Sequence, residues 1–115
     1  MPIDARYVFI ASMDVDADKE AIFNEVYDTE HIPALLRVPG VRSAKRMTGE
    51  AFAVSIGGTA NAVAHRGPLY SAIFEIDSPY VLSSPQWANA VETGRWPREV
   101  RPYTRNRQHA VFKVR

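Results

Sequence analysis

The sequence predicts an α+β fold in which four antiparallel strands form one sheet and two helices cover one of its faces. The first observation is that strand-like and helix-like segments follow one another in the order β-α-β-β-α-β. The second is that the N-terminal strand is apolar on both faces, as in sheets that are covered on both sides. The third is size, because 115 residues with 46% apolar and 23% charged side chains suit a single globular domain, residues 1–115. Together these observations indicate the ferredoxin-like, split βαβ arrangement.

The charge balance and the missing residue types exclude several classes of protein. The 14 basic and 13 acidic residues leave a formal net charge of +1, so no overall field favours nucleic acid or an anionic membrane. The absence of cysteine rules out disulfides, a thiolate nucleophile and cysteine-bound metals. The N-terminal segment lacks a basic region, and no apolar run approaches the roughly 18 residues of a membrane helix. We therefore expect a cytoplasmic protein that binds neither nucleic acid nor membrane.

The first strand, Arg6 to Met13, is rich in aromatic and β-branched residues. Alternate residues point to opposite faces, so Phe9 and Ala11 share one face while Val8 and Ile10 share the other. Both faces are apolar, and two helices cover only one of them. We therefore expect the second face to be covered by another copy of the chain, giving a homodimer through the sheet.

A helix is predicted after this strand, with Asp16 or Asp18 as its N-cap. Its apolar stripe has the three- and four-residue spacing of a helix face and comprises Ile22, Phe23, Val26 and Tyr27, and His31 could extend it. Pro33 cannot donate a hydrogen bond and disfavours helical geometry at Ile32, so the regular helix is predicted to end near His31.

The remaining elements follow from breakers and apolar patterning. A second, less apolar strand that could be an edge is predicted at Val41–Gly49, and a loop in which "FAVSI" could pair locally at Ala51–Arg66. Leu69–Ile76 is the clearest later strand, and "SPQWANAVETG" is a helix that Gly94 ends. An irregular, arginine-rich segment and a final strand, "QHAVFKVR", complete the chain.

The stretch "YDTEHIPALLRVPGV", Tyr27 to Val41, resembles the EthD-like members of the dimeric α/β-barrel superfamily. In that family an aromatic-Asp-x-Glu-His-x-Pro pattern closes the first helix, and Pro-Gly leads into the second strand. The later stretch "SPQWANAVETGRWPREVRPYTRNR" is similar to the tail of uncharacterised proteins in the same group, whereas Ala51 to Arg66 matches least. Val26 departs from the pattern, where a Trp often stands. The resemblance implies a homodimeric α/β barrel in which two sheets pack face to face, but no particular reaction.

Tyr27 and His31 are the leading catalytic candidates. They are four residues apart, so they share a helix face and could line one pocket. A neutral imidazole beside a phenol can move protons near pH 7, which suits enolisation, cyclisation or isomerisation of a small carbonyl compound. The alternative is that His31 only ends the helix and bonds its last carbonyl groups. Glu30 is interpreted as a solvated helix residue.

His65 and the arginine-rich segment supply candidate substrate-binding residues. His65 lies in a Gly-flanked loop that could close over a cleft, whereas His109 lies on the last strand, on a face predicted to look partly outward. Arginine forks recognise carboxylates and stack on aromatic rings, which makes Arg101, Arg105 and Trp96 candidates for an anion-binding rim. The alternative is a solvated connection in which these arginines pair with acids. The three histidines lack the short spacings of a zinc site, so no metal is expected.

Two functions are compatible with these residues. The first is a homodimer that binds or transforms a small aromatic or polyketide-like molecule, with Tyr27 and His31 transferring protons and no cofactor. The second is a non-catalytic dimer that binds a ligand or another protein, with His31 as a structural cap.

Overall fold

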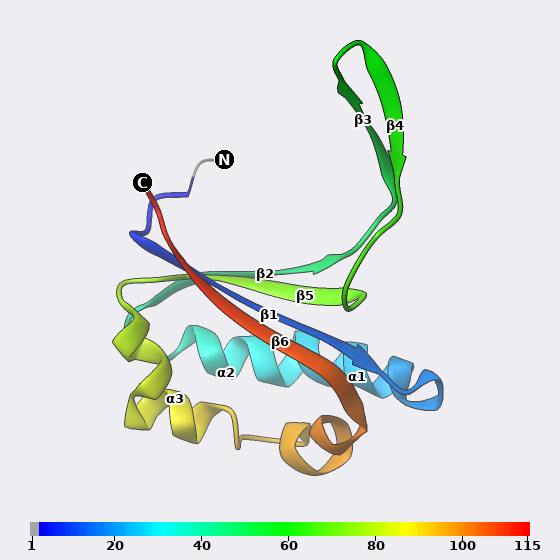
Figure 1. Cartoon of the computed structure of the whole chain (residues 1–115). Coiled ribbons are helices and arrows are strands. Elements are labelled where there is room, and N and C mark those ends of the chain that lie inside the picture. Colours follow the sequence, from blue (N-terminus) through cyan, green and yellow to red (C-terminus); the bar gives the residue numbers. More distant parts are fainter. Residues whose placement is uncertain (1–2) are drawn as a thin grey trace.

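The computed structural model describes residues 3–115, which form an antiparallel four-stranded sheet with helices on one face (Figure 1). The strands lie in the order β2-β5-β1-β6, and their bounds are Val41–Thr48, Tyr70–Ile76, Tyr7–Val15 and Thr104–Lys113. This arrangement confirms the predicted fold class and places β2 at an edge. Strand β6 forms the other edge and begins four residues before the strand predicted from Gln108.

The two faces of the sheet differ as the alternation of β1 predicts. Phe9 and Ala11 are opposite Phe74 and Ala72 of β5, and all four are buried beneath the helices. Phe9 and Phe74 stack with ring centroids 5.7 Å apart. The core continues through buried side chains of the helical segments and of the turn after α2, among them Phe23, Val26, Leu35, Val38, Val81, Ala90 and Val100.

The first helical segment is longer than predicted, because the chain stays helical past Pro33. Helix α1 (Glu20–Val26) runs into a π-helical turn (Tyr27–His31) and then into α2 (Ile32–Leu36). Pro33 lies in the first turn of α2, where a missing backbone N–H breaks no α-helical hydrogen bond, and the wider π turn before it absorbs the change of geometry. The prediction that the helix ends near His31 was wrong, and so was the interpretation of His31 as a terminal cap.

The predicted N-cap also differs. Asp16 begins the helical region, but its side chain caps no backbone N–H group and instead pairs with Arg105. A short 3-10 turn at Ala17–Lys19 precedes α1.

The segment predicted as a loop is largely a β-hairpin. Strands β3 (Phe52–Ile56) and β4 (Thr59–Val63) pair with each other, and "FAVSI" pairs locally as the sequence suggested. Gly57 and Gly58 form the tight turn with φ of +62° and +82°, values that favour glycine. Figure 1 shows the hairpin rising from the sheet on the side away from the helices.

The second helical region is made of short pieces. A 3-10 turn (Pro79–Ser83) precedes α3 (Pro85–Ala90), whose first turn is capped by the Ser84 hydroxyl accepting from the Trp87 N–H at 3.2 Å. Gly94 follows with a φ of +70°, and a π turn (Trp96–Val100) and a 3-10 turn (Arg101–Tyr103) lead into β6. Within residues 3–115, no helix has the length and apolar character needed to cross a membrane.

Candidate functional site

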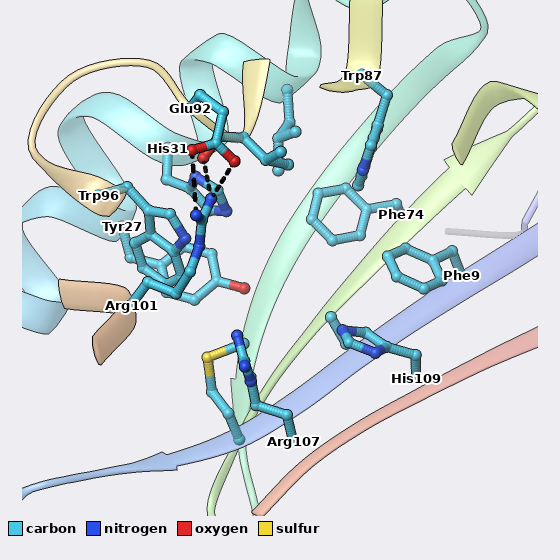
Figure 2. A pocket seen from close by; sticks show the side chains of 14 residues that line it. Phe9, Tyr27, His31, Phe74, Trp87, Glu92, Trp96, Arg101, Arg107 and His109 are labelled. Atoms are coloured by element: carbon cyan, nitrogen blue, oxygen red, sulfur yellow. Dashed lines mark hydrogen bonds and ion pairs between the residues drawn. The ribbon is translucent and has the colours of Figure 1, made fainter. Parts of the chain in front are cut away.

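A cavity of about 330 Å³ lies between the helix-facing side of the sheet and the helical segments (Figure 2). Its walls are mostly aromatic and aliphatic, and a few polar groups converge on it, which is the usual composition of a small-molecule site. The aromatic side chains and histidines of the lining are Phe9, Phe74, Trp87, Tyr27, Trp96, His31 and His109. Its charged side chains are Glu92, Arg101 and Arg107.

His31 lies at the buried end of the cavity, with 6% of its surface exposed. Its ring stacks on Trp96 with centroids 3.9 Å apart and planes 11° from parallel, and it meets Tyr27 edge-on at 5.2 Å. Its Nδ1 atom is buried and has no hydrogen-bond partner among the described residues. Burial, aided by the positive charge of Arg101, lowers the pKa of His31 to about 3, so the imidazole is neutral at physiological pH.

Tyr27 reaches the same cavity from the preceding turn of the helix. Only 3% of its surface is exposed, and Figure 2 shows its hydroxyl group directed into the space in front of Phe74. Burial raises the pKa of Tyr27 to about 12, although the nearby charge of Arg46 opposes the shift. The guanidinium carbon of Arg46 lies 4.5 Å from the ring centroid, on the ring face. Tyr27 therefore remains a protonated phenol that can donate a hydrogen bond.

An ion pair between Glu30 and Arg95 anchors the segment that carries Trp96 beside His31, in line with the alternative that the arginines of this segment pair with acids. Glu30 accepts hydrogen bonds from the Arg95 backbone N–H at 2.9 Å and from its Nε at 2.6 Å, and Glu25 accepts from the same guanidinium. These bonds lower the pKa of Glu30, the backbone bond contributing most. Glu30 is thus not simply a solvated helix residue: it fixes the segment that carries Trp96.

Arg101 is positioned at the cavity by a bidentate pair with Glu92. Its two terminal nitrogens donate to the carboxylate oxygens at 3.1 and 2.8 Å, and one also donates to the Val91 carbonyl at 2.6 Å. The hydrogen bonds from Arg101 hold the pKa of Glu92 below its usual range. The positive charge of Arg101 is therefore largely balanced within the wall.

Strand β6 contributes Arg107 and His109, both exposed at the mouth of the cavity. His109 is opposite Ala11 on the helix-facing side of the sheet, and its ring stacks on Phe9 at 5.7 Å. His109 is therefore exposed, as expected, but it lies on the helix-facing side of the sheet, at the cavity. Neither side chain was among the site residues proposed from the sequence, because a strand's register is set by its partner strand, β1.

Arg105 lies outside the cavity, and a β-bulge explains why. The pairing of β1 with β6 shifts by one residue between Ser12, which is opposite Gln108, and Asp14, which is opposite Arg105. Beyond a one-residue shift in the pairing, each side chain of the bulged strand lies on the face opposite to the one that regular alternation would give it. Arg105 accordingly points to the face away from the helices and pairs with Asp16.

His65 also lies outside the cavity, at the base of the hairpin. Its Nε2 is 2.9 Å from the Pro68 carbonyl oxygen.

The structure brings together four of the six residues predicted for the site, namely Tyr27, His31, Trp96 and Arg101. Among residues 3–115, no group of three or more His, Cys, Asp or Glu side chains is placed to hold a metal ion.

This arrangement can bind a flat, largely apolar molecule and exchange hydrogen bonds with it at one end. The aromatic walls supply contact area, Tyr27 supplies a donor, and the imidazole of His31 forms part of the wall beside it. With a pKa of about 3, lowered mainly by burial, the imidazole is a weak base. A negative charge developing on a bound molecule would offset only the smaller contribution of Arg101.

Comparison with known proteins supports the fold. No protein-family model matches this chain, and no curated protein sequence matches it either. Among solved structures, a point mutant of MhuD with two manganese protoporphyrin IX molecules bound per active site is similar to it. The TM-score is 0.59 at 15% sequence identity, over 94% of this chain and 93% of that one. The likeness confirms the ferredoxin-like fold.

Proposed function

We propose that this protein binds a small aromatic or polyketide-like molecule in the cavity and transforms it by proton transfer without a cofactor. The observation that carries the proposal is a largely aromatic cavity of about 330 Å³ whose wall holds the Tyr27 phenol and the His31 imidazole side by side. A mostly apolar cavity with a few convergent polar groups is the usual form of a small-molecule site.

The proposed chemistry is enolisation of a carbonyl compound. The Tyr27 hydroxyl would donate to the carbonyl oxygen as negative charge develops there. The imidazole of His31 would take the proton from the adjacent carbon, and Trp96 would hold the ring in place by stacking. The proton could then return to another carbon, which gives isomerisation, or the carbanion could attack a second carbonyl, which gives cyclisation.

The second candidate function is ligand binding without catalysis, and the low pKa of His31 favours it. The two candidates differ in one measurable step, the exchange of acidic C–H protons. We expect the protein to accelerate deuterium exchange at the α-carbon of 2-tetralone, followed by NMR, and Tyr27→Phe to reduce that acceleration by about tenfold or more. Binding of 2-tetralone with no accelerated exchange would leave the non-catalytic function.

Binding itself is tested by calorimetry with a panel of aromatic ketones, naphthols and manganese protoporphyrin IX. The porphyrin is included because the similar MhuD structure contains it. We expect at least one bicyclic compound to bind, and His31→Ala and Tyr27→Phe to weaken its binding. Tyr80→Phe, at a residue that is 84% exposed, is the matched control. Unchanged affinity in both cavity variants would contradict the proposed site.

We also propose that the protein is a homodimer joined through the open sheet face, as in the EthD-like group that its sequence resembles. On that face Ile10 is opposite Ile73 and Ala110, and Phe112 is 56% exposed at its edge. Hairpin β3–β4 rises on this same side (Figure 1), so a second copy seated on the sheet would lie against it. Sedimentation should give the mass of a dimer and Ile73→Glu should give a monomer, whereas a wild-type monomer would contradict this assembly.

A further inference from the structure

Arg107 carries the only unbalanced charge on the cavity wall. The lining contains two arginines and one glutamate. Glu92 neutralises Arg101 through the bidentate pair, whereas Arg107 has no acidic side chain within ion-pair distance among the described residues. The cavity therefore presents one net positive charge at its mouth, and this charge is free to meet a ligand.

The fold holds Arg107 in this place by an unusual backbone conformation. Asn106 has a φ of +56°, and no other non-glycine residue among those described has a positive φ. Its side-chain amide donates to Asp14 at 2.9 Å, which pins the bulge to β1. A β-bulge often redirects a side chain beside a functional site. Here it separates the two arginines, so Arg105 faces away from the helices while Arg107 stays at the cavity.

Polar side chains reach the cavity from two sides. Figure 2 shows Tyr27, His31 and Trp96 on one side, and Arg107 and His109 on the strand across from them, with Phe9 and Phe74 along the wall. An aromatic molecule lying along that wall would present one substituent to the Tyr27 hydroxyl and another to the Arg107 guanidinium.

We propose that the ligand is an aromatic carboxylate and that Arg107 binds its carboxylate group. This inference rests on the proposed function and specifies its substrate class. A guanidinium fork matches the two oxygens of a carboxylate, and one unbalanced positive charge matches one negative charge. A hydroxyl or carbonyl group at the far end of the ligand then meets Tyr27 and His31.

The test compares two probes that differ chiefly in charge, 6-hydroxy-2-naphthoate and its primary amide, by isothermal titration calorimetry. Wild type should bind the carboxylate about tenfold more tightly than the amide, as expected for a charge-assisted pair at a partly exposed site. Arg107→Gln should remove this preference by weakening carboxylate binding about tenfold while leaving the amide within about twofold. Arg98→Gln removes an exposed arginine outside the cavity and should retain the preference.

The role of Asn106 as a positioning residue gives a second readout. Asn106→Gly permits a positive φ and should keep the carboxylate preference, whereas Asn106→Val disfavours it and should lose the preference even if the amide still binds. Equal binding of the two probes by wild type, or an unchanged preference in Arg107→Gln, would overturn the inference and leave the proposed function standing. Failure of wild type to bind either naphthalene probe or any compound of the panel would overturn both.

Discussion

His31 should make the protein unusually sensitive to mild acid. In the folded chain its pKa is about 3, against an ordinary value of 6.5. Because the folded-state pKa is the lower one, the stability that depends on a neutral His31 is fully present above pH 6.5. It is lost as the pH falls from 6.5 towards 3, since only the unfolded chain takes up a proton over that range.

The magnitude follows from the depth of the pKa shift. Each pH unit between the two pKa values changes the free energy of unfolding by about 1.36 kcal/mol. At pH 5, roughly 1.5 units below the unfolded pKa, His31 should therefore lower the free energy of unfolding by about 2 kcal/mol relative to pH 7.

The assay is urea denaturation followed by tryptophan fluorescence at pH 7, 6 and 5, at one protein concentration, with His31→Phe for comparison. Phenylalanine keeps a ring against Trp96 but cannot titrate, and it removes the unsatisfied nitrogen. We expect His31→Phe to be about 1 kcal/mol more stable than wild type at pH 7. The difference should widen by about 2 kcal/mol at pH 5.

The control is Tyr80→Phe, a change at an 84% exposed residue outside the cavity, which should behave like wild type at each pH. If the difference between wild type and His31→Phe stayed constant from pH 7 to pH 5, His31 would not be a buried neutral group and the reasoning would be refuted.

Two further predictions concern stability. Gly94→Ala should lower the free energy of unfolding by about 2–3 kcal/mol in urea titrations, because Gly94 has a φ of +70° and an added Cβ would lie 2.5 Å from the Glu30 carboxylate. Gly58→Ala, also left-handed but with open space around it, should cost only about 1 kcal/mol, and equal costs would contradict a role for the close approach. Phe74→Ala should cost about 3–5 kcal/mol because Phe74 is 1% exposed, while Tyr80→Ala, at an 84% exposed residue, should change stability by less than about 0.5 kcal/mol. A Phe74→Ala cost below about 1 kcal/mol would mean that the cavity wall is not packed as described.

The parts of the fold encoded in local patterning could be predicted from the sequence. The alternation of β1 correctly gave its two faces, and the four-residue spacing of Tyr27 and His31 gave a pair whose rings meet at 5.2 Å. The hairpin was also within reach, because Gly57-Gly58 stands between two five-residue runs, which is a strong signal for a two-residue turn. The second run, "TANAV", consists mostly of small and polar residues that are not typical of a strand, so its pairing with "FAVSI" was not predicted.

The rest of the candidate site depends on pairings between distant residues. Glu30 and Arg95 are 65 positions apart, and no local pattern links them. Arg105 and Arg107 are indistinguishable in the sequence, and only the bulge opposite β1 decides that Arg107 lies at the cavity. The position of the exposed His109 at the cavity is likewise decided by its partner, Ala11.

The π turn at Tyr27–His31 has a consequence for the phase of the whole helical segment. A π turn holds about one residue more than an α turn, and each residue of a helix advances by about 100°. If the same residues formed a regular α-helix throughout, the extra residue would rotate α2 relative to α1 by about that angle. Leu35, now 1% exposed, would then take the outward direction of Leu36, which is 42% exposed. The number of residues in this turn, as much as their identity, therefore decides which side chains of the segment face the cavity.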